Sequence, residues 1–128
     1  MAPQDDQADL VEVFKRERRL ELRREGRLLK RDRIALGLAR ERHKEREGDG
    51  RTPEGTYTID ARNPRSSFHL SLRVSYPGID DRAHAAWLEV PPAGDIYIHG
   101  LPNGWLTDAQ VRELWSLVPT GAKVVTHP

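Results

Sequence analysis

The sequence predicts a mainly β domain with one clear helix near its C-terminus. Several short segments alternate apolar and polar residues with a period of two, which is typical of strands that bury one face. Near the C-terminus a capping sequence precedes apolar residues spaced at i, i+3, i+4 and i+7, the pattern of an amphipathic helix. These two observations together predict a sandwich or barrel of strands with a late helix.

The first third of the chain predicts a meander of three strands, over residues 10–15, 18–24 and 27–36. β-Branched and aromatic residues favour the first strand, and Glu25-Gly26 is a turn signal between the second and third. A helix over 15–33 is the competing interpretation, because Arg, Glu and Leu are good helix formers. We prefer strands, since Gly26 would interrupt that helix and the leucines form no stripe with a helical period.

The middle of the chain predicts a loop followed by two strands. The long polar loop spans 42–55 and ends in Pro53-Glu54-Gly55, which has turn chemistry. Residues 56–59 then alternate as a strand. The clearest strand is 68–74, with four apolar side chains on one face. His69 belongs to the opposite face, where we expect it to be exposed or to line a groove.

The last third predicts a short helix, a buried strand, the clear helix and a final strand, over 80–87, 95–99, 107–118 and 123–125. Thr107 is the expected N-cap of the clear helix and Gln110 completes a capping box. Its apolar stripe consists of Val111, Leu114, Trp115 and Val118. We interpret Trp87 and Trp115 as core residues.

Length and charge limit the possible classes of function. The 128 residues suit a single domain, which we assign to 10–128 after a flexible terminus at 1–9. Net charge is only +1, and basic residues between Lys15 and Arg46 are interleaved with acidic ones, as on a solvated face. Phe14 is the only aromatic residue before Tyr57, so we expect no nucleic-acid partner.

The chain has no cysteine, which excludes disulfides and a thiol nucleophile. No run is long enough to span a bilayer, and no signal peptide precedes the domain, so a complete chain would be cytoplasmic. We expect no cofactor and no metal, because the five histidines form no ligand-type pair. A zinc site from His69, Asp95 and His99 is a minor alternative.

Several collinear segments together resemble the L,D-transpeptidase (YkuD-type) catalytic domain. The early strands fit that family, as does the loop that leads to Thr52-Pro53-Glu54-Gly55. Further matches are the strand that ends in Ser75-Tyr76-Pro77, the run Ile96-Tyr97-Ile98-His99-Gly100, and the segment 113–121. The resemblance covers nearly the whole chain and implies an L,D-transpeptidase-like β-sandwich or barrel.

The chain departs from the family pattern at the nucleophile. The family signature runs from a histidine through a spacer to Ser/Thr-X-Gly-Cys. Here the histidine is His99, and the chain passes from Asn103-Gly104-Trp105-Leu106 directly to Thr107. The spacer and the Gly-Cys element are therefore missing, and no other residue replaces the cysteine.

The resemblance implies covalent catalysis on peptidoglycan in the cell envelope or periplasm. A cysteine thiolate attacks a stem-peptide carbonyl to form a thioester, and an amine from a second stem resolves it. The implied base region here is His99 with Gly100. The residues that we expect to contact the stem peptide are His69, Tyr76, Asn103 and Trp105.

Without the cysteine we expect little or no transpeptidation. One hypothesis is an impaired L,D-transpeptidase of cell-wall cross-linking. A second, from a different class, is a binding module that holds stem peptides or regulates an active paralogue. A third is a shortened form of an active enzyme, and a fourth is a hydrolase that uses His99 with a metal. The sequence leaves the oligomeric state open.

Overall fold

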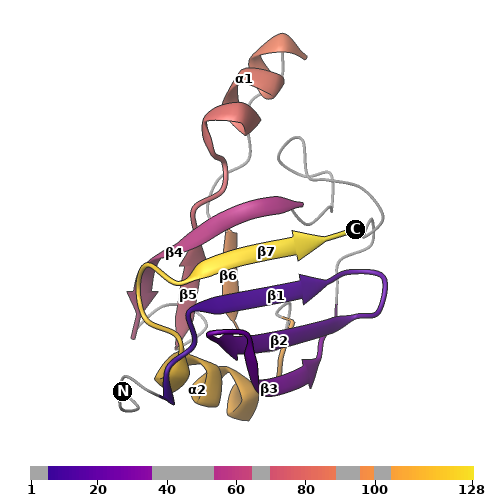
Figure 1. Ribbon diagram of the computed structural model, residues 1–128. Helices are drawn as coiled ribbons and strands as arrows, with labels where there is room; N and C mark the ends of the chain where they lie inside the picture. Colours follow the sequence, from indigo (N-terminus) through magenta and orange to yellow (C-terminus); the bar gives the residue numbers. More distant parts are fainter. Residues whose placement is uncertain (1–5, 36–53, 65–69, 89–95, 100–104) are drawn as a thin grey trace.

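The computed structural model describes residues 6–35, 54–64, 70–88, 96–99 and 105–128, and it describes His99 without its side chain (Figure 1). These ranges contain seven strands and two helices. In chain order they are β1 (Leu10–Phe14), β2 (Arg19–Arg24), β3 (Arg27–Arg33), β4 (Gly55–Asn63), β5 (Ser71–Val74), α1 (Ile79–Trp87), β6 (Ile96–His99), α2 (Asp108–Leu117) and β7 (Lys123–His127).

The strands form one sheet in the order β3-β2-β1-β7-β4-β5-β6. All neighbours are antiparallel except β1 and β7, which pair in parallel near the two ends of the chain. Strand β4 belongs to both halves of the sheet, because Gly55–Thr58 pair with β7 and the following residues pair with β5. A register shift between Ile59 and Ala61 bends the strand there, as bulges do. In Figure 1, β5 and β6 consequently run behind β7 and β1.

The hydrophobic core lies between the two halves of this curled sheet and α2. Alternating residues of each strand point into it, which is why the period-two pattern predicts the strands. Fully buried members from the sheet and α2 include Val11, Val13, Leu20, Leu22, Ile59, Leu72, Ile98 and Leu114. The mainly β fold class is thus confirmed.

Helix α2 begins at the predicted cap. The Thr107 hydroxyl accepts a hydrogen bond from the Gln110 backbone N–H at 3.2 Å, and the Gln110 side chain accepts one from the Thr107 N–H at 2.8 Å. Val111, Leu114 and Val118 are buried, so the predicted stripe faces the core. Trp115, the fourth member of the stripe, is only partly buried.

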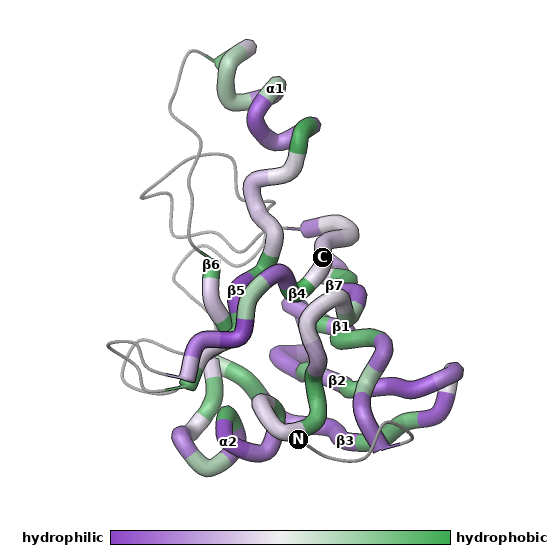
Figure 2. The backbone as a smooth tube through the Cα atoms, turned by 90° about the vertical axis from the view of Figure 1, so that its left-hand side faces the viewer, coloured by the Kyte–Doolittle hydropathy of each residue, from purple (hydrophilic) through white to green (hydrophobic). Residues whose placement is uncertain are grey.

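The prediction that Trp87 belongs to the core is wrong. Helix α1 spans nearly the predicted residues, but it stands away from the sheet in both Figure 1 and Figure 2. Ala85 is its one buried residue, and Trp87 is 78% exposed with Ile79 also exposed. Because α1 buries only an alanine, Trp87 has no apolar surface of the domain to pack against. Its ring instead stacks on His84, with 6.0 Å between the ring centroids.

The predicted strand boundaries hold to within a few residues. The early meander is confirmed as β1–β3, although β3 ends at Arg33 because the Ile34 and Ala35 N–H groups bond to Arg18 and Trp105. The predicted strand at 68–74 is seen as β5 from Ser71, and residues 68 and 69 lie outside the description. No helix within the described ranges is long and apolar enough to cross a membrane.

Candidate functional site

Strand β6 places His99 at the last strand of the described sheet. Its neighbour β5 fixes the register, with Leu72 opposite Ile98 and Ser71 opposite His99. Leu72 and Ile98 are fully buried, so the core anchors β6 just before His99. The next residue, Gly100, lies outside the description. The role of His99 and Gly100 as a base region therefore stays a prediction, resting on a strand position that the core sets firmly.

Ser71 is an unexpected feature of this region. Its side chain is 1% exposed, and its hydroxyl has no hydrogen-bond partner in the described structure. A buried hydroxyl without a partner is costly and uncommon. The alternating pattern places Ser71 on the polar face of the strand, together with His69. That pattern did not indicate that this face would be covered.

Tyr76 is buried, at 4% exposure, beside a small polar cluster. Its ring packs edge-on against Tyr57, with centroids 5.8 Å apart. The Tyr57 hydroxyl donates to Asp81 at 2.8 Å, and the Gly78 N–H donates to the same carboxylate oxygen at 2.9 Å. Burial, followed by the bond to Asp81, raises the pKa of Tyr57 well above its usual range, so the phenol keeps its proton. The cluster joins β4 to the start of α1.

Trp105 is partly buried and packs against the core. Its carbonyl accepts a hydrogen bond from the Ala35 N–H at 2.9 Å, and the next residue, Leu106, is buried. These contacts fix the chain just before α2 against the end of β3. Contact of Tyr76 or Trp105 with a peptide stays a prediction.

Arg62 and Trp115 form a second pair that the sequence did not reveal. The Arg62 guanidinium lies 3.7 Å from the centre of the Trp115 ring, and its terminal nitrogen donates to the Trp115 carbonyl at 2.8 Å. Arg62 Nε and the Trp115 indole nitrogen are buried without hydrogen-bond partners in the described structure. Burial lowers the pKa of Arg62 from its ordinary value. Arg62 pairs with Leu72 of β5, so this pair lies on the face of the sheet opposite to the Ser71 side chain.

The other predicted contact residues, His69 and Asn103, lie outside the described residues. So does Asp95 of the alternative zinc site. The described ranges bring together no group of three His, Cys, Asp or Glu side chains that would hold a metal ion.

The sequence matches the family model of the L,D-transpeptidase catalytic domain, YkuD, over residues 8–126. That match spans nearly the whole chain, and the chain therefore belongs to this family. Because the chain has no cysteine, it belongs to the family without the thiol that the family signature contains. No curated protein matches the chain.

Solved structures share the fold at low sequence identity. The helical cell shape determining protein Pgp2 from Campylobacter jejuni superposes with a TM-score of 0.72 at 21% identity, over 92% of this chain and 46% of that one. Bd1075 from Bdellovibrio bacteriovorus superposes with a TM-score of 0.66 at 18% identity, over 96% of this chain and 49% of that one. An L,D-transpeptidase from Mycobacterium smegmatis superposes with a TM-score of 0.63 at 12% identity, over 93% of this chain and 58% of that one. The chain thus spans about half the length of these proteins.

Proposed function

We propose that the chain binds peptidoglycan stem peptides without cross-linking them. The observation on which this rests is the absence of cysteine from a chain that otherwise keeps the L,D-transpeptidase fold and the strand leading to His99. A unit that loses its nucleophile loses most of its rate, and what is left comes from binding and from fixed polar groups. Recognition is therefore the part of the family's activity that this chain is equipped to retain.

The described hydroxyls near β5 and α2 are poor substitutes for a thiol. Ser71 is buried, and a substrate carbonyl has no access to a side chain with 1% exposure. The Ser75 hydroxyl accepts the Thr58 N–H at 3.0 Å, and the Thr107 hydroxyl caps α2. None of the three is paired with a base in the described structure, and activation by a base is what a serine or threonine nucleophile requires.

Two measurements on the same purified protein test the proposal. Isothermal titration with a tetrapeptide stem measures binding, and intact mass spectrometry after incubation with a carbapenem detects an acyl adduct. We expect binding without an adduct. A stable adduct would overturn the non-catalytic assignment, and absence of tetrapeptide binding would overturn the recognition role.

Substitution of His99 tests where the peptide binds. His99→Ala should weaken tetrapeptide binding by about two- to tenfold, the cost of one lost hydrogen bond. Arg112→Gln is the control, because Arg112 is exposed on α2. Equal affinities of the wild type and His99→Ala would place the peptide elsewhere on the domain.

A further inference from the structure

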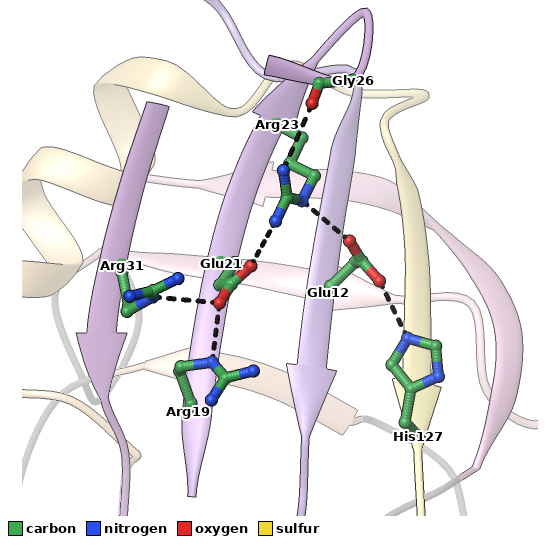
Figure 3. A network of polar contacts seen from close by, with 7 residues as sticks. All are labelled: Glu12, Arg19, Glu21, Arg23, Gly26, Arg31 and His127. Atoms are coloured by element: carbon green, nitrogen blue, oxygen red, sulfur yellow. Dashed lines mark hydrogen bonds and ion pairs between the residues drawn. The ribbon is translucent and has the colours of Figure 1, made fainter. Parts of the chain in front are cut away.

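The outer face of β1–β3, opposite the core, holds arginines around a buried carboxylate (Figure 3). Glu21 on β2 is only 1% exposed, although it lies on the side of the sheet away from the core. Three guanidinium groups cover it: Arg19 Nε at 2.6 Å, Arg23 at 2.7 Å and Arg31 Nε at 3.0 Å. Burial alone would raise the pKa of Glu21, but bonds from Arg23 and Arg31 lower it, so the carboxylate is charged.

The three arginines differ in how many donors they have used. All three guanidinium nitrogens of Arg23 already donate hydrogen bonds, to Glu12, the Gly26 carbonyl and Glu21. Arg31 donates to Glu21 through Nε alone, and Arg19 Nε lies 2.6 Å from the same carboxylate oxygen as an ion pair, without a hydrogen bond. Their paired terminal nitrogens have no partner in the described part of the chain. Such a fork of N–H donors matches the two oxygens of a carboxylate.

Arg33 adds a third cation without a partner among the described residues. In the β2–β3 register Arg33 lies directly opposite Arg19, and Arg31 lies opposite Glu21. Like charges directly opposite each other on one face of a sheet are destabilising. Glu21 is already shared among three guanidinium groups, and none of its ion pairs within the described ranges is with Arg33. An anion bound between Arg19 and Arg33 would relieve this repulsion.

The position of Arg19 is set in advance. Its guanidinium carbon lies 4.5 Å from the centre of the Phe14 ring, and Phe14 stacks on His127 at 4.8 Å. His127 in turn contacts Glu12 at 2.9 Å. A guanidinium held by a ring and a carboxylate loses less conformational entropy when it binds a ligand than a free surface arginine does.

The charge of the chain is concentrated on this part of the sheet. Residues 10–35 contain ten basic and five acidic side chains, although the whole chain has a net charge of only +1. Arg31 is 58% exposed, so solvent and ligands reach its terminal nitrogens. Attraction of an acidic polymer to this face is therefore a local property that the overall charge conceals.

We propose that Arg19, Arg31 and Arg33 form a carboxylate-binding surface that holds peptidoglycan through the acidic groups of its stem peptides. The identity of the polymer rests on the proposed function, whereas the anion site rests on the arginines themselves. The surface lies on β2 and β3, at the opposite end of the strand order from β6 and His99. It gives the domain a second contact with the same polymer.

The test compares two double variants that remove equal charge from different faces. Arg31→Gln/Arg33→Gln removes two forks from the proposed surface. Arg82→Gln/Arg112→Gln removes two exposed arginines from α1 and α2. Cosedimentation with purified sacculi at low salt should show about tenfold weaker binding for the first pair and unchanged binding for the second. Equal losses in the two pairs, or none in the first, would overturn the proposal.

Three further readings make the outcome specific. Arg33→Gln alone removes a side chain with no partner in the described structure, so a loss of sacculus binding in a variant that unfolds in urea like wild type comes from the lost guanidinium. The Arg31→Gln/Arg33→Gln variant should bind the tetrapeptide at the His99 region as tightly as wild type. If the wild-type protein binds the tetrapeptide but this variant binds sacculi as well as wild type does, the surface alone is refuted. Retention of sacculi that depends on Arg31 and Arg33, without tetrapeptide binding, would refute the proposed function alone. Tighter binding of inorganic polyphosphate than of poly-L-glutamate at equal ionic strength would overturn the carboxylate assignment.

Discussion

Glu21→Gln should destabilise the fold by about 2 kcal/mol, because it removes the carboxylate that three arginines share. Breaking a fully buried ion pair from one side costs about 3–5 kcal/mol, since the remaining charge is left without a partner. The arginines here are 28–58% exposed, so their guanidinium groups can regain water and the cost falls below that range. Glutamine also keeps one acceptor oxygen, but its side-chain NH2 group would point N–H donors at the N–H donors of the arginines.

Urea unfolding followed by tryptophan fluorescence measures this loss, with Glu17→Gln as the control. Glu17 is exposed in the β1–β2 turn, and its substitution should change stability by less than about 0.5 kcal/mol. The pKa of Glu21 is lowered in the folded state, so its contribution is present above its unfolded-state pKa of about 4.3. The contribution is lost as the pH falls through the folded-state value.

The difference between wild type and Glu21→Gln should therefore be full at pH 7 and should shrink at acid pH. A variant as stable as wild type at pH 7 would show that the arginines gain nothing from Glu21. A difference that persists undiminished at low pH would show that shape, and not charge, is what the substitution changes. Either result would refute the electrostatic account of the buried carboxylate.

Three further perturbations test the rest of the fold. Thr107→Ala should cost about 1 kcal/mol in urea unfolding, because it removes the cap of α2, and wild-type stability would contradict the capping box. Leu114→Ala should cost about 2–5 kcal/mol, since Leu114 is fully buried, and a loss under 1 kcal/mol would mean that the site collapses around the smaller side chain. Burial alone would lower the pKa of Lys30, but the bond to Glu113 and the charge of Asp32 raise it. The stability that Lys30 contributes is full below its unfolded-state pKa of about 10.4 and is lost as the pH rises through the folded value. Lys30→Gln should thus have a lower free energy of unfolding than wild type at pH 8, and this difference should become smaller in alkali. A difference that does not change with pH would count against the ion pairs.

Local patterns predicted the elements whose causes are local. The β1–β3 meander follows from alternation and from the turn at Gly26, which has a positive φ of 80° that glycine adopts freely. The start of α2 follows from a capping box that needs only Thr107 and Gln110. Such features depend on residues within one or two turns of each other, so a single sequence contains them in full.

Features that depend on distant segments were not predictable in the same way. The parallel pairing of β1 with β7 joins residues more than a hundred positions apart, and no turn signal marks it. Glu21 reads as a solvated charge on a strand, and its burial requires arginines from β2 and β3 to close over it. Ser71 likewise reads as an exposed residue, and the sequence does not show what covers its face. The Trp87 error has the same origin, because its exposure depends on where α1 stands and not on its own side chain.

The packing of α2 explains how this domain keeps its fold without the cysteine segment. The shortened connection enters α2 through Trp105, whose carbonyl is bound by Ala35 at the end of β3. At the other end of the helix the Leu117 carbonyl accepts the Ala8 N–H at 2.7 Å. Between these two anchors, Arg62 holds the Trp115 carbonyl and the buried stripe fills the core. Of these contacts, only that of Trp105 involves the connection from β6, at its end next to α2. A segment removed from that connection therefore takes the nucleophile with it, while the helix and the strands that position His99 are held by other parts of the chain.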